Sequence, residues 1–224
     1  MSREVDYVTE KRCPLCRETR SRSLTARPHP GGSYRHCRRC DLIFATSGGL
    51  LPPQQEKERY LEHDNTHDNE GYVSMLSRFL ERAVLPFSEA GRALDFGCGP
   101  GPVLADLLGD RGYRVEVYDP FFYPDRRPLG ESYQLITCTE VVEHVARAQE
   151  TWALLFSLLS PGGVLAVMTH FHPGPGLFED WWYHRDPTHI RFYSPQTFRY
   201  LSRHLGLEIL DSDGQKTITL RRPQ

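Results

Sequence analysis

The sequence predicts an α/β protein with a doubly wound, mostly parallel sheet, an abridged sheet edge and a C-terminal antiparallel hairpin, preceded by a small zinc ribbon. Three observations lead to this prediction. An apolar run turns into a glycine-rich loop at residues 94–101, a second apolar run ends in Asp119, and two C-x-x-C pairs lie near the N-terminus. Strand and helix patterns alternate between residues 72 and 221, as in a sheet with helices on both faces.

Length and composition fit one α/β domain with a small accessory module. The chain has 224 residues, of which 39% are hydrophobic, which is enough for one sizeable core. No apolar run approaches the ~18 residues that span a bilayer, and residues 1–6 lack the apolar segment of a signal peptide. We therefore expect a cytoplasmic protein without a membrane span. Its oligomeric state is left open.

Four of the six cysteines form two C-x-x-C pairs separated by 20 residues. In a reducing compartment, clustered cysteines are typical of metal sites rather than disulfides. Two such loops can complete one tetrahedral zinc site. A redox-active C-x-x-C is the alternative, but no thioredoxin-like setting surrounds either pair. The predicted zinc ligands are Cys13, Cys16, Cys37 and Cys40, whereas Cys98 and Cys138 are interpreted as small apolar fillers.

The residues around the second pair suit short strands, at 33–36 and 41–44. We expect residues 1–45 to form the ribbon, residues 46–70 a linker or lid, and residues 71–224 the main domain. The ribbon is expected to have a core of its own. Its loss would then leave the main domain folded.

Charge is distributed unevenly along the chain. Residues 1–40 carry a formal charge of +6 and the remainder −8. Four zinc-bound thiolates would lower the charge of the ribbon to roughly +2 to +4. Two interpretations stay open: a surface that binds nucleic acid, or a structural ribbon that packs on the main domain or shapes the entrance to its site.

The polar stretch that follows the ribbon contains Gly48-Gly49 and Pro52-Pro53, which indicate a linker. A helix within it is expected near residues 54–62, closing over the active site. Apolar residues at helical spacing predict a helix over 72–87 that Pro86 ends.

The glycine-rich loop is expected to be a cofactor site. Gly97, Gly99 and Gly101 permit positive φ and leave the backbone open to a ligand at the start of the helix 103–111. A dinucleotide fingerprint would place its third glycine at position 102, which is Pro102, so NAD is disfavoured. Asp119, at the tip of the neighbouring strand 115–119, can accept two hydrogen bonds from a ribose diol.

Together these residues resemble the class I S-adenosylmethionine (SAM) methyltransferases, over about residues 70 to 220. Leu159-Ser-Pro-Gly-Gly163 matches a further family motif, a strand followed by Pro-Gly-Gly. In that family the glycine loop holds the methionine end of SAM and the acid holds the ribose. The resemblance implies these cofactor-binding residues: Asp95, Gly97, Gly99, Gly101, Asp119, Pro120, Phe121, Thr139 and Glu140.

The sequence departs from the family between Asp119 and the next strand, 133–139. Only 13 residues intervene, and they include three prolines. The helix and edge strand that usually occupy this interval cannot fit, so the sheet should be shorter here. Phe121, Phe122 or Tyr123 would then stack on the adenine. Alternatively, they only cap the shortened edge.

The strand 133–139 leads into an E-x-x-E-H motif. It resembles the metal-binding motif of the ubiquinone-pathway O-methyltransferases and of the small-RNA 3′-terminal 2′-O-methyltransferases. That resemblance implies a divalent ion such as Mg²⁺ or Mn²⁺. In metal-free relatives, the Glu instead caps the cofactor region and the His bonds the backbone, and this alternative stays open. The implied ligands are Glu140, Glu143, His144 and His189.

The loop after the strand 164–169 is rich in histidine and tryptophan, between His170 and His189. It follows the strand next to the cofactor, in the position where this family builds its acceptor site. Aromatic side chains favour a small aromatic or quinone-like acceptor and O-methylation, although the tryptophans could equally form a hydrophobic plug. RNA is the alternative acceptor, and a non-catalytic SAM-binding scaffold is a second alternative. Candidate catalytic bases are His144, His170 and His189.

The remaining elements follow from local patterns. Apolar residues at 152, 155, 156 and 159 predict a helix that runs up to Pro161. Ser194 is a predicted N-cap with Pro195 at the first turn of a helix that Leu201, Leu205 and Leu207 bury. Residues 208–211 and 217–221 should form a hairpin around Asp213-Gly214.

Overall fold

The structure, a computed structural model, describes residues 12–29, 32–46 and 51–224. The first eleven residues, which contain part of the basic N-terminal stretch, and residues 47–50 of the predicted linker lie outside the described residues. Within the described parts, no helix is long and apolar enough to cross a lipid bilayer.

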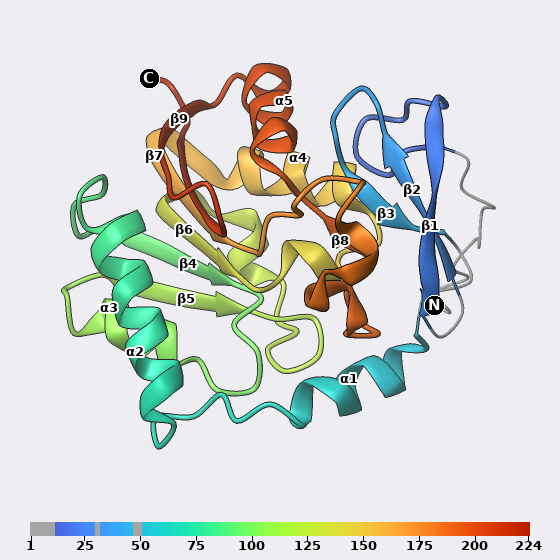
Figure 1. The fold of residues 1–224 in the computed structure, drawn as a ribbon. Coiled ribbons are helices and arrows are strands. Elements are labelled where there is room, and N and C mark those ends of the chain that lie inside the picture. The colour runs from blue at the N-terminus through green and yellow to red at the C-terminus, as the bar shows by residue number, and fades with distance from the viewer. Residues whose placement is uncertain (1–11, 30–31, 47–50) are drawn as a thin grey trace.

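A six-stranded sheet forms the centre of the molecule (Figure 1). Four neighbouring strands are parallel, and the last two run antiparallel as a hairpin. This confirms the predicted mostly parallel sheet with its C-terminal hairpin. In spatial order the strands are β5 (Arg114–Tyr118), β4 (Arg92–Phe96), β6 (Tyr133–Thr139), β7 (Leu159–Met168), β10 (Thr217–Arg221) and β9 (Glu208–Ser212).

The parallel edge of the sheet stops at β5, as expected from the short interval that follows it. Between β5 and β6 the chain makes one isolated bridge, Asp119 to Tyr123, and a single 3₁₀ turn, Arg127–Gly130. Three prolines in this stretch remove backbone donors and fix φ, which disfavours both a helix and a paired strand.

Helices cover both faces of the sheet, which makes the fold doubly wound. Leu94 and Ala93 are neighbours in β4 and point into different cores because side chains alternate along a strand. Helices α2 (Glu70–Phe79) and α3 (Val103–Gly109) belong to the core on the Ala93 side. Helices α4 (Ala148–Leu158) and α5 (Pro195–Leu205) belong to the core on the Leu94 side.

Three boundaries differ from the sequence prediction. The helix expected over 72–87 is α2 followed by a π turn at Leu80–Val84, where Leu85 N–H donates to the Leu80 carbonyl. Leu159, expected in a helix, begins strand β7 instead. Gly162 has a φ of +76°, and the pairing of β6 with β7 changes register there, so this strand continues through the Pro-Gly-Gly segment as an irregularity.

Helix α5 begins as the sequence predicts, with Ser194 as its N-cap. The Ser194 hydroxyl accepts a hydrogen bond from Thr197 N–H at 3.2 Å, and Thr197 Oγ1 accepts one from Ser194 N–H. This reciprocal pair is a capping box. Gly206 ends the helix in the left-handed conformation, with a φ of +71°.

The four-cysteine module, residues 12–46, adds a second sheet that is antiparallel and four-stranded. Two of its strands lie near those expected. Its last strand comes from residues 191–192, just before α5, and was not predicted. In spatial order the strands are β1 (Ser21–His29), β2 (Gly32–Cys37), β3 (Ile43–Ala45) and β8 (Arg191–Phe192).

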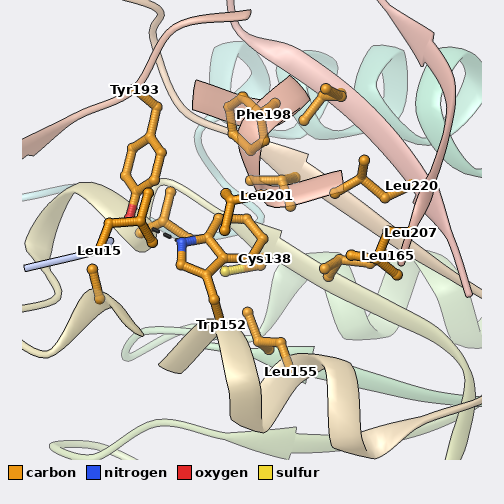
Figure 2. Packing of buried hydrophobic residues seen from close by; sticks show 14 of the residues in the cluster. Leu15, Cys138, Trp152, Leu155, Leu165, Tyr193, Phe198, Leu201, Leu207 and Leu220 are labelled. Carbon is orange, nitrogen blue, oxygen red and sulfur yellow. Dashed lines mark hydrogen bonds between the residues drawn. The ribbon is translucent and has the colours of Figure 1, made fainter. Parts of the chain in front are cut away.

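The expectation that this module has a separate core is wrong. Leu15 and Phe44 of the module belong to the same buried cluster as Trp152 of α4 and Phe198 of α5. Figure 2 shows Leu15 beside the Trp152 and Tyr193 pair, whose indole N–H donates to the tyrosine hydroxyl at 3.1 Å. Apolar residues that flank the cysteines therefore complete the core of the large sheet.

In the sequence, helix α1 (Pro53–Leu61) comes after β3 and before β4. In Figure 1 it lies on the outside of the molecule. It buries none of its residues fully, so it contributes little to either core. Its contacts instead go to residues at the carboxyl ends of the parallel strands. This is the edge at which open α/β sheets bind ligands.

Candidate active site

The glycine-rich loop joins β4 to α3 and packs tightly against two other segments. Gly97 and Gly99 have left-handed backbone, with φ of +79° and +67°. A Cβ atom on Gly97 would lie 2.4 Å from the Val141 side chain, and one on Gly101 would lie 2.2 Å from the Asn65 carbonyl oxygen. Backbone conformation and close neighbours therefore both require glycine in this loop.

Asp119, the first residue after β5, ties this loop to the aromatic stretch that follows. Its Oδ2 accepts a hydrogen bond from Gly99 N–H at 3.1 Å. Its Oδ1 accepts from the N–H groups of Phe121 and Phe122 at 2.8 and 3.1 Å. Pro120 is exposed in the turn between them. The structure thus brings the predicted ribose and adenine residues together beside the glycine loop.

Asp95, at the end of β4, is 2% exposed. The Thr137 hydroxyl donates to its Oδ1 at 2.9 Å. Burial raises the pKa of Asp95 to about 7, because a desolvated carboxylate is disfavoured. Thr139 is the last residue of β6 and lies opposite Met168 of β7. Both side chains therefore sit at the carboxyl edge of the sheet, as the sequence predicted.

The E-x-x-E-H motif leaves β6 in a sharp turn. Glu140 has a φ of +52°, and its N–H donates to the Met168 carbonyl at 2.8 Å. Glu143 and His144 follow on a single 3₁₀ turn, Val142–His144. Val141, whose side chain packs against Gly97, lies between Glu140 and Glu143 in the sequence. The motif therefore borders the predicted cofactor site.

His144 and His189 lie face to edge, with ring centroids 4.7 Å apart. Each ring binds a backbone carbonyl through Nδ1: His144 that of Thr188 at 3.1 Å, and His189 that of Tyr183 at 2.7 Å. Because a carbonyl only accepts, both Nδ1 atoms carry the proton and both Nε2 atoms keep a free lone pair. Burial lowers the pKa of His144 to about 3 and that of His189 to about 4, so both rings are neutral.

Glu143 is fully buried beside these rings. Its Oε1 is hydrogen-bonded to the Tyr183 hydroxyl, and among the described residues its Oε2 has no hydrogen-bond partner. Ligand atoms of Glu143, His144 and His189 all lie within 4.8 Å of one another. Glu140, the fourth predicted ligand, is not in this group. Its carboxylate instead accepts from the Tyr183 hydroxyl at 2.8 Å.

This donor set has the features of a metal site. One carboxylate and two imidazoles suit a first-row divalent ion. Ligating histidines usually donate their second N–H to a carbonyl or carboxylate, as both rings do here. A buried carboxylate oxygen without a partner is costly, and burial raises the pKa of Glu143 well above its usual range, with Glu140 adding to the rise. A cation would relieve both effects.

His170 lies apart from this group, against the aromatic side chains of the acceptor loop (residues 170–193). Its ring is 5.1 Å from that of Trp182 and 4.9 Å from that of Tyr183. Trp182 is 57% exposed, an unusual exposure for so large an apolar side chain. Burial and Lys216 lower the pKa of His170, which keeps the imidazole neutral near pH 7.

Helix α1 contacts both parts of this region. The Tyr60 ring lies 5.2 Å from His144 and 5.7 Å from Phe121. Arg59 forms an ion pair with Asp186, at 2.9 Å. Asp186 in turn accepts from the N–H and hydroxyl of Thr188, the residue whose carbonyl holds His144. The expected lid helix therefore touches the site.

The four cysteines of the module are all buried and close together. Sγ atoms are 3.5 Å apart for Cys13 and Cys40 and 3.4 Å apart for Cys16 and Cys37. A tetrahedron with Zn–S bonds of ~2.3 Å has S···S distances of ~3.8 Å. All four ligand atoms lie within 4.8 Å of one another. The cluster therefore fits one tetrathiolate ion with no open position.

Sequence reasoning missed several residues that hold these groups. Tyr183 binds both glutamates, Asp186 supports the histidine turn, and Tyr60 covers His144. Local sequence gives no indication that Tyr183 contacts the two glutamates, 40 and 43 positions away, or that Arg59 contacts Asp186, 127 positions away. The open groove of about 560 Å³ between α3 and β5 contains none of the predicted site residues. It marks the shortened sheet edge rather than the site.

Comparisons with known proteins agree with this geometry. A family profile described as a methyltransferase domain matches residues 66–212. A SAM-dependent methyltransferase from Archaeoglobus fulgidus has a similar structure, with a TM-score of 0.52 and 15% identity over 67% of this chain and 94% of that one. The N-methyltransferase NodS from Bradyrhizobium japonicum, solved with S-adenosyl-L-homocysteine, has a TM-score of 0.51 and 16% identity over 76% of this chain and 98% of that one. No curated protein matches the sequence.

Proposed function

The chain belongs to the methyltransferase-domain family and is a SAM-dependent methyltransferase, and we propose that it methylates a hydroxyl group of a small aromatic or quinone-like acceptor. The observation that carries this proposal is the buried Glu143, whose Oε2 has no hydrogen-bond partner among the described residues, with ligand atoms of Glu143, His144 and His189 all within 4.8 Å of one another. These groups border the glycine loop through Val141. A hydroxyl bound there would lie next to the cofactor.

The fit of SAM rests on the glycine loop and the acids beside it. Gly97 and Gly101 let the loop pack directly on Val141 and Asn65, where a side chain would clash, and this packing fixes the shape of the loop on which SAM is proposed to lie. In this proposal Asp119 accepts from the ribose through Oδ2, which has a lone pair left beside its bond to Gly99 N–H, whereas Oδ1 already accepts two hydrogen bonds. Phe121 stacks on the adenine. The methionine end lies toward the strand ends, among Asp95, Thr139 and Glu140.

The fit of a divalent ion rests on three ligands: the Glu143 carboxylate and the Nε2 atoms of His144 and His189. Both imidazoles are already in the tautomer that ligation needs, and Thr188 and Tyr183 hold their orientation. Glu140 is better placed to orient Tyr183 than to bind the ion. Three ligands leave positions open for the acceptor, the usual arrangement of a catalytic site.

When bound, SAM supplies an electrophilic methyl group, and a divalent ion lowers the pKa of a hydroxyl that it binds. The chain must place that hydroxyl in line with the methyl and sulfur atoms. His170, neutral near pH 7, then accepts the hydroxyl proton. That hydroxyl oxygen would bond to the methyl carbon of bound SAM, and the electron pair of the S–CH₃ bond would leave with the sulfur. The exposed ring of Trp182 offers a flat surface against which an aromatic acceptor can stack.

The four-cysteine cluster is proposed to hold zinc. All four side chains are thiols, which zinc prefers, and none is exposed. Such a closed site has no position for substrate, so its role is structural.

RNA is the second candidate acceptor. It is favoured by the exposed arginines of the module, at positions 12, 17, 22, 38 and 39. These side chains would contact phosphates without reading sequence.

A labelling experiment tests this function and separates the two acceptors. The zinc-loaded protein is incubated with SAM carrying a deuterated methyl group, a divalent ion, and either small molecules or RNA from the same cells. We expect the label in a phenolic or quinol-like molecule, and none with Glu143→Gln. Label confined to RNA would favour the second candidate. Label transferred equally well by Glu143→Gln would contradict the role of the ion.

A further inference from the structure

The four-cysteine module is joined to the acceptor loop by a strand pair. Strand β3 begins three positions after Cys40 and pairs with β8, with Ile43 opposite Phe192 and Phe44 opposite Arg191. Ala45 N–H extends the ladder to the Ile190 carbonyl at 2.9 Å. Because Ile190 directly follows His189, the module holds the backbone next to a proposed ion ligand.

Ile190 also connects this ladder to the E-x-x-E-H motif. Its N–H donates to the Glu143 carbonyl at 2.9 Å. Arg191, 2% exposed, donates to the carbonyls of Ala45 at 3.2 Å and Ala146 at 2.8 Å. One short segment therefore bonds the module on one side and the turn that carries Glu143 on the other.

Asp41, the residue after Cys40, connects the module to both ends of the acceptor loop. The Ser194 hydroxyl, at the end of that loop, donates to Asp41 Oδ2 at 2.6 Å. His172, near its start, bonds the Asp41 carbonyl through Nε2 at 2.8 Å. His36 Nε2 lies 2.7 Å from Asp41 Oδ1. A single residue beside a cysteine thus bridges the two ends of a segment of more than 20 residues.

The backbone of Asp41 depends on the second C-x-x-C turn. Asp41 has a φ of +65°, in the left-handed region, and its N–H donates to the Cys37 carbonyl at 2.9 Å. Metal bound by Cys37 and Cys40 would fix this turn. Any change in the turn moves Asp41 directly.

We propose that Asp41 is a positioning residue through which the metal-bound four-cysteine module sets the geometry of the acceptor site. It acts through the acceptor loop and does not touch the cofactor residues. The inference rests on the proposed function, since the site that it positions is that of Glu143, His144 and His189.

The test compares Asp41→Gly with the wild type. Glycine keeps the positive φ and removes the bonds to Ser194 and His36. Asp41→Asn, which also tolerates this backbone and can still accept from Ser194, is the conservative variant. The matched control is Asp211→Asn. Asp211 lies on the distant strand β9, forms an ion pair with Arg82, and has a side chain about as exposed as that of Asp41.

Four quantities are measured: zinc content, SAM affinity by calorimetry, Mn²⁺ affinity by electron paramagnetic resonance, and hydrogen exchange of amides 183–193. For Asp41→Gly we expect unchanged zinc, SAM affinity within twofold, Mn²⁺ affinity lowered at least tenfold and amide exchange at least tenfold faster. Asp41→Asn should restore part of the Mn²⁺ affinity and part of the protection of these amides from exchange. The control should match the wild type.

Asp41→Gly with full zinc, wild-type Mn²⁺ affinity and wild-type amide exchange would overturn the proposal. If Asp41→Gly loses zinc, Mn²⁺ affinity and amide exchange are measured on His172→Phe instead. That substitution removes the hydrogen bond between His172 and the Asp41 carbonyl, and the same two results then decide. If the wild type itself binds no Mn²⁺ beside SAM, the proposed ion site fails. Amide exchange then still decides whether Asp41 positions the loop.

Discussion

The cofactor side and the acceptor side of the sheet edge are built in different ways. On the cofactor side, the hydrogen bonds of Asp119 reach Gly99, Phe121 and Phe122, at most 20 positions away, and that of Asp95 reaches Thr137, 42 positions away. The acceptor side takes residues from three distant segments, and its bonds span up to 153 positions. The first side therefore needs only the large sheet, whereas the second also needs the four-cysteine module.

The two candidate ion sites show the same contrast. Four thiols close the module site on all sides. The site of Glu143, His144 and His189 offers one carboxylate and two imidazoles, with ligand positions left open. One site can hold a fold together, and the other can bind a substrate. Substitutions can test whether the cofactor side and the acceptor side respond independently.

The largest effect is expected from Cys37→Ser. Because the module shares a core with α4 and α5, loss of its metal should lower the free energy of unfolding by on the order of 5 kcal/mol. Thermal unfolding and zinc analysis measure this, with Cys98→Ala, a cysteine outside the cluster, as the control. A zinc-free Cys37→Ser protein with the melting temperature of the control would show that the cores are separate after all.

Glu143→Gln should affect the acceptor side alone. Loss of the carboxylate should weaken Mn²⁺ binding more than about 100-fold and leave SAM affinity unchanged. Metal-free stability should not fall, because glutamine removes a buried charge. Calorimetry with Mn²⁺ and with SAM checks both statements, and Glu150→Gln, an exposed acid paired with Arg147, is the control. Equal Mn²⁺ affinity in both variants would remove Glu143 from the site.

Asp119→Ala should affect the cofactor side alone. The loss of its bonds to the ribose and to the glycine loop should weaken SAM binding by about 1–3 kcal/mol. Mn²⁺ binding should stay as in the wild type. Asp125→Ala, an exposed acid in the same loop, serves as the control. Unchanged SAM affinity in calorimetry would mean that Asp119 only shapes the loop.

The smallest effect concerns Asp95 and pH. Its folded pKa of about 7 lies above the unfolded value of 3.8. Between these two values the folded state binds more protons, so the contribution of Asp95 to stability falls as pH rises. Wild-type protein without SAM should lose about 1 kcal/mol relative to Asp95→Asn between pH 6 and pH 7. Denaturant unfolding at the two pH values tests this, and parallel behaviour of the two proteins would contradict it.

The sequence predicted the parts of the fold that local patterns determine. Glycines at 97 and 99, the N-cap at Ser194 and the hairpin at Asp213-Gly214 are each specified by a few adjacent residues. The short interval after Asp119 correctly indicated a sheet that ends at β5. The cysteine spacing likewise indicated a cluster, because two C-x-x-C loops have few other uses in one small module.

Long-range packing decided what could not be predicted. The two-residue strand β8 forms only because β3 lies beside it, and nothing in Arg191–Phe192 indicates a strand. The shared core depends on Leu15 and Phe44 meeting Trp152, which sequence cannot place. Tyr183 contacts Glu140 and Glu143 only because the acceptor loop folds back onto them. Such contacts arise from tertiary structure, which overrides local preference.

The central claim is that the protein holds two different ions, one structural and one at the acceptor side. Anomalous scattering from crystals grown with S-adenosyl-L-homocysteine and excess Mn²⁺ tests it directly. We predict a zinc peak ~2.3 Å from all four Sγ atoms and a manganese peak within ~2.5 Å of Glu143 Oε2 and the Nε2 atoms of His144 and His189. A zinc peak alone, with no density at the second site, would contradict the claim.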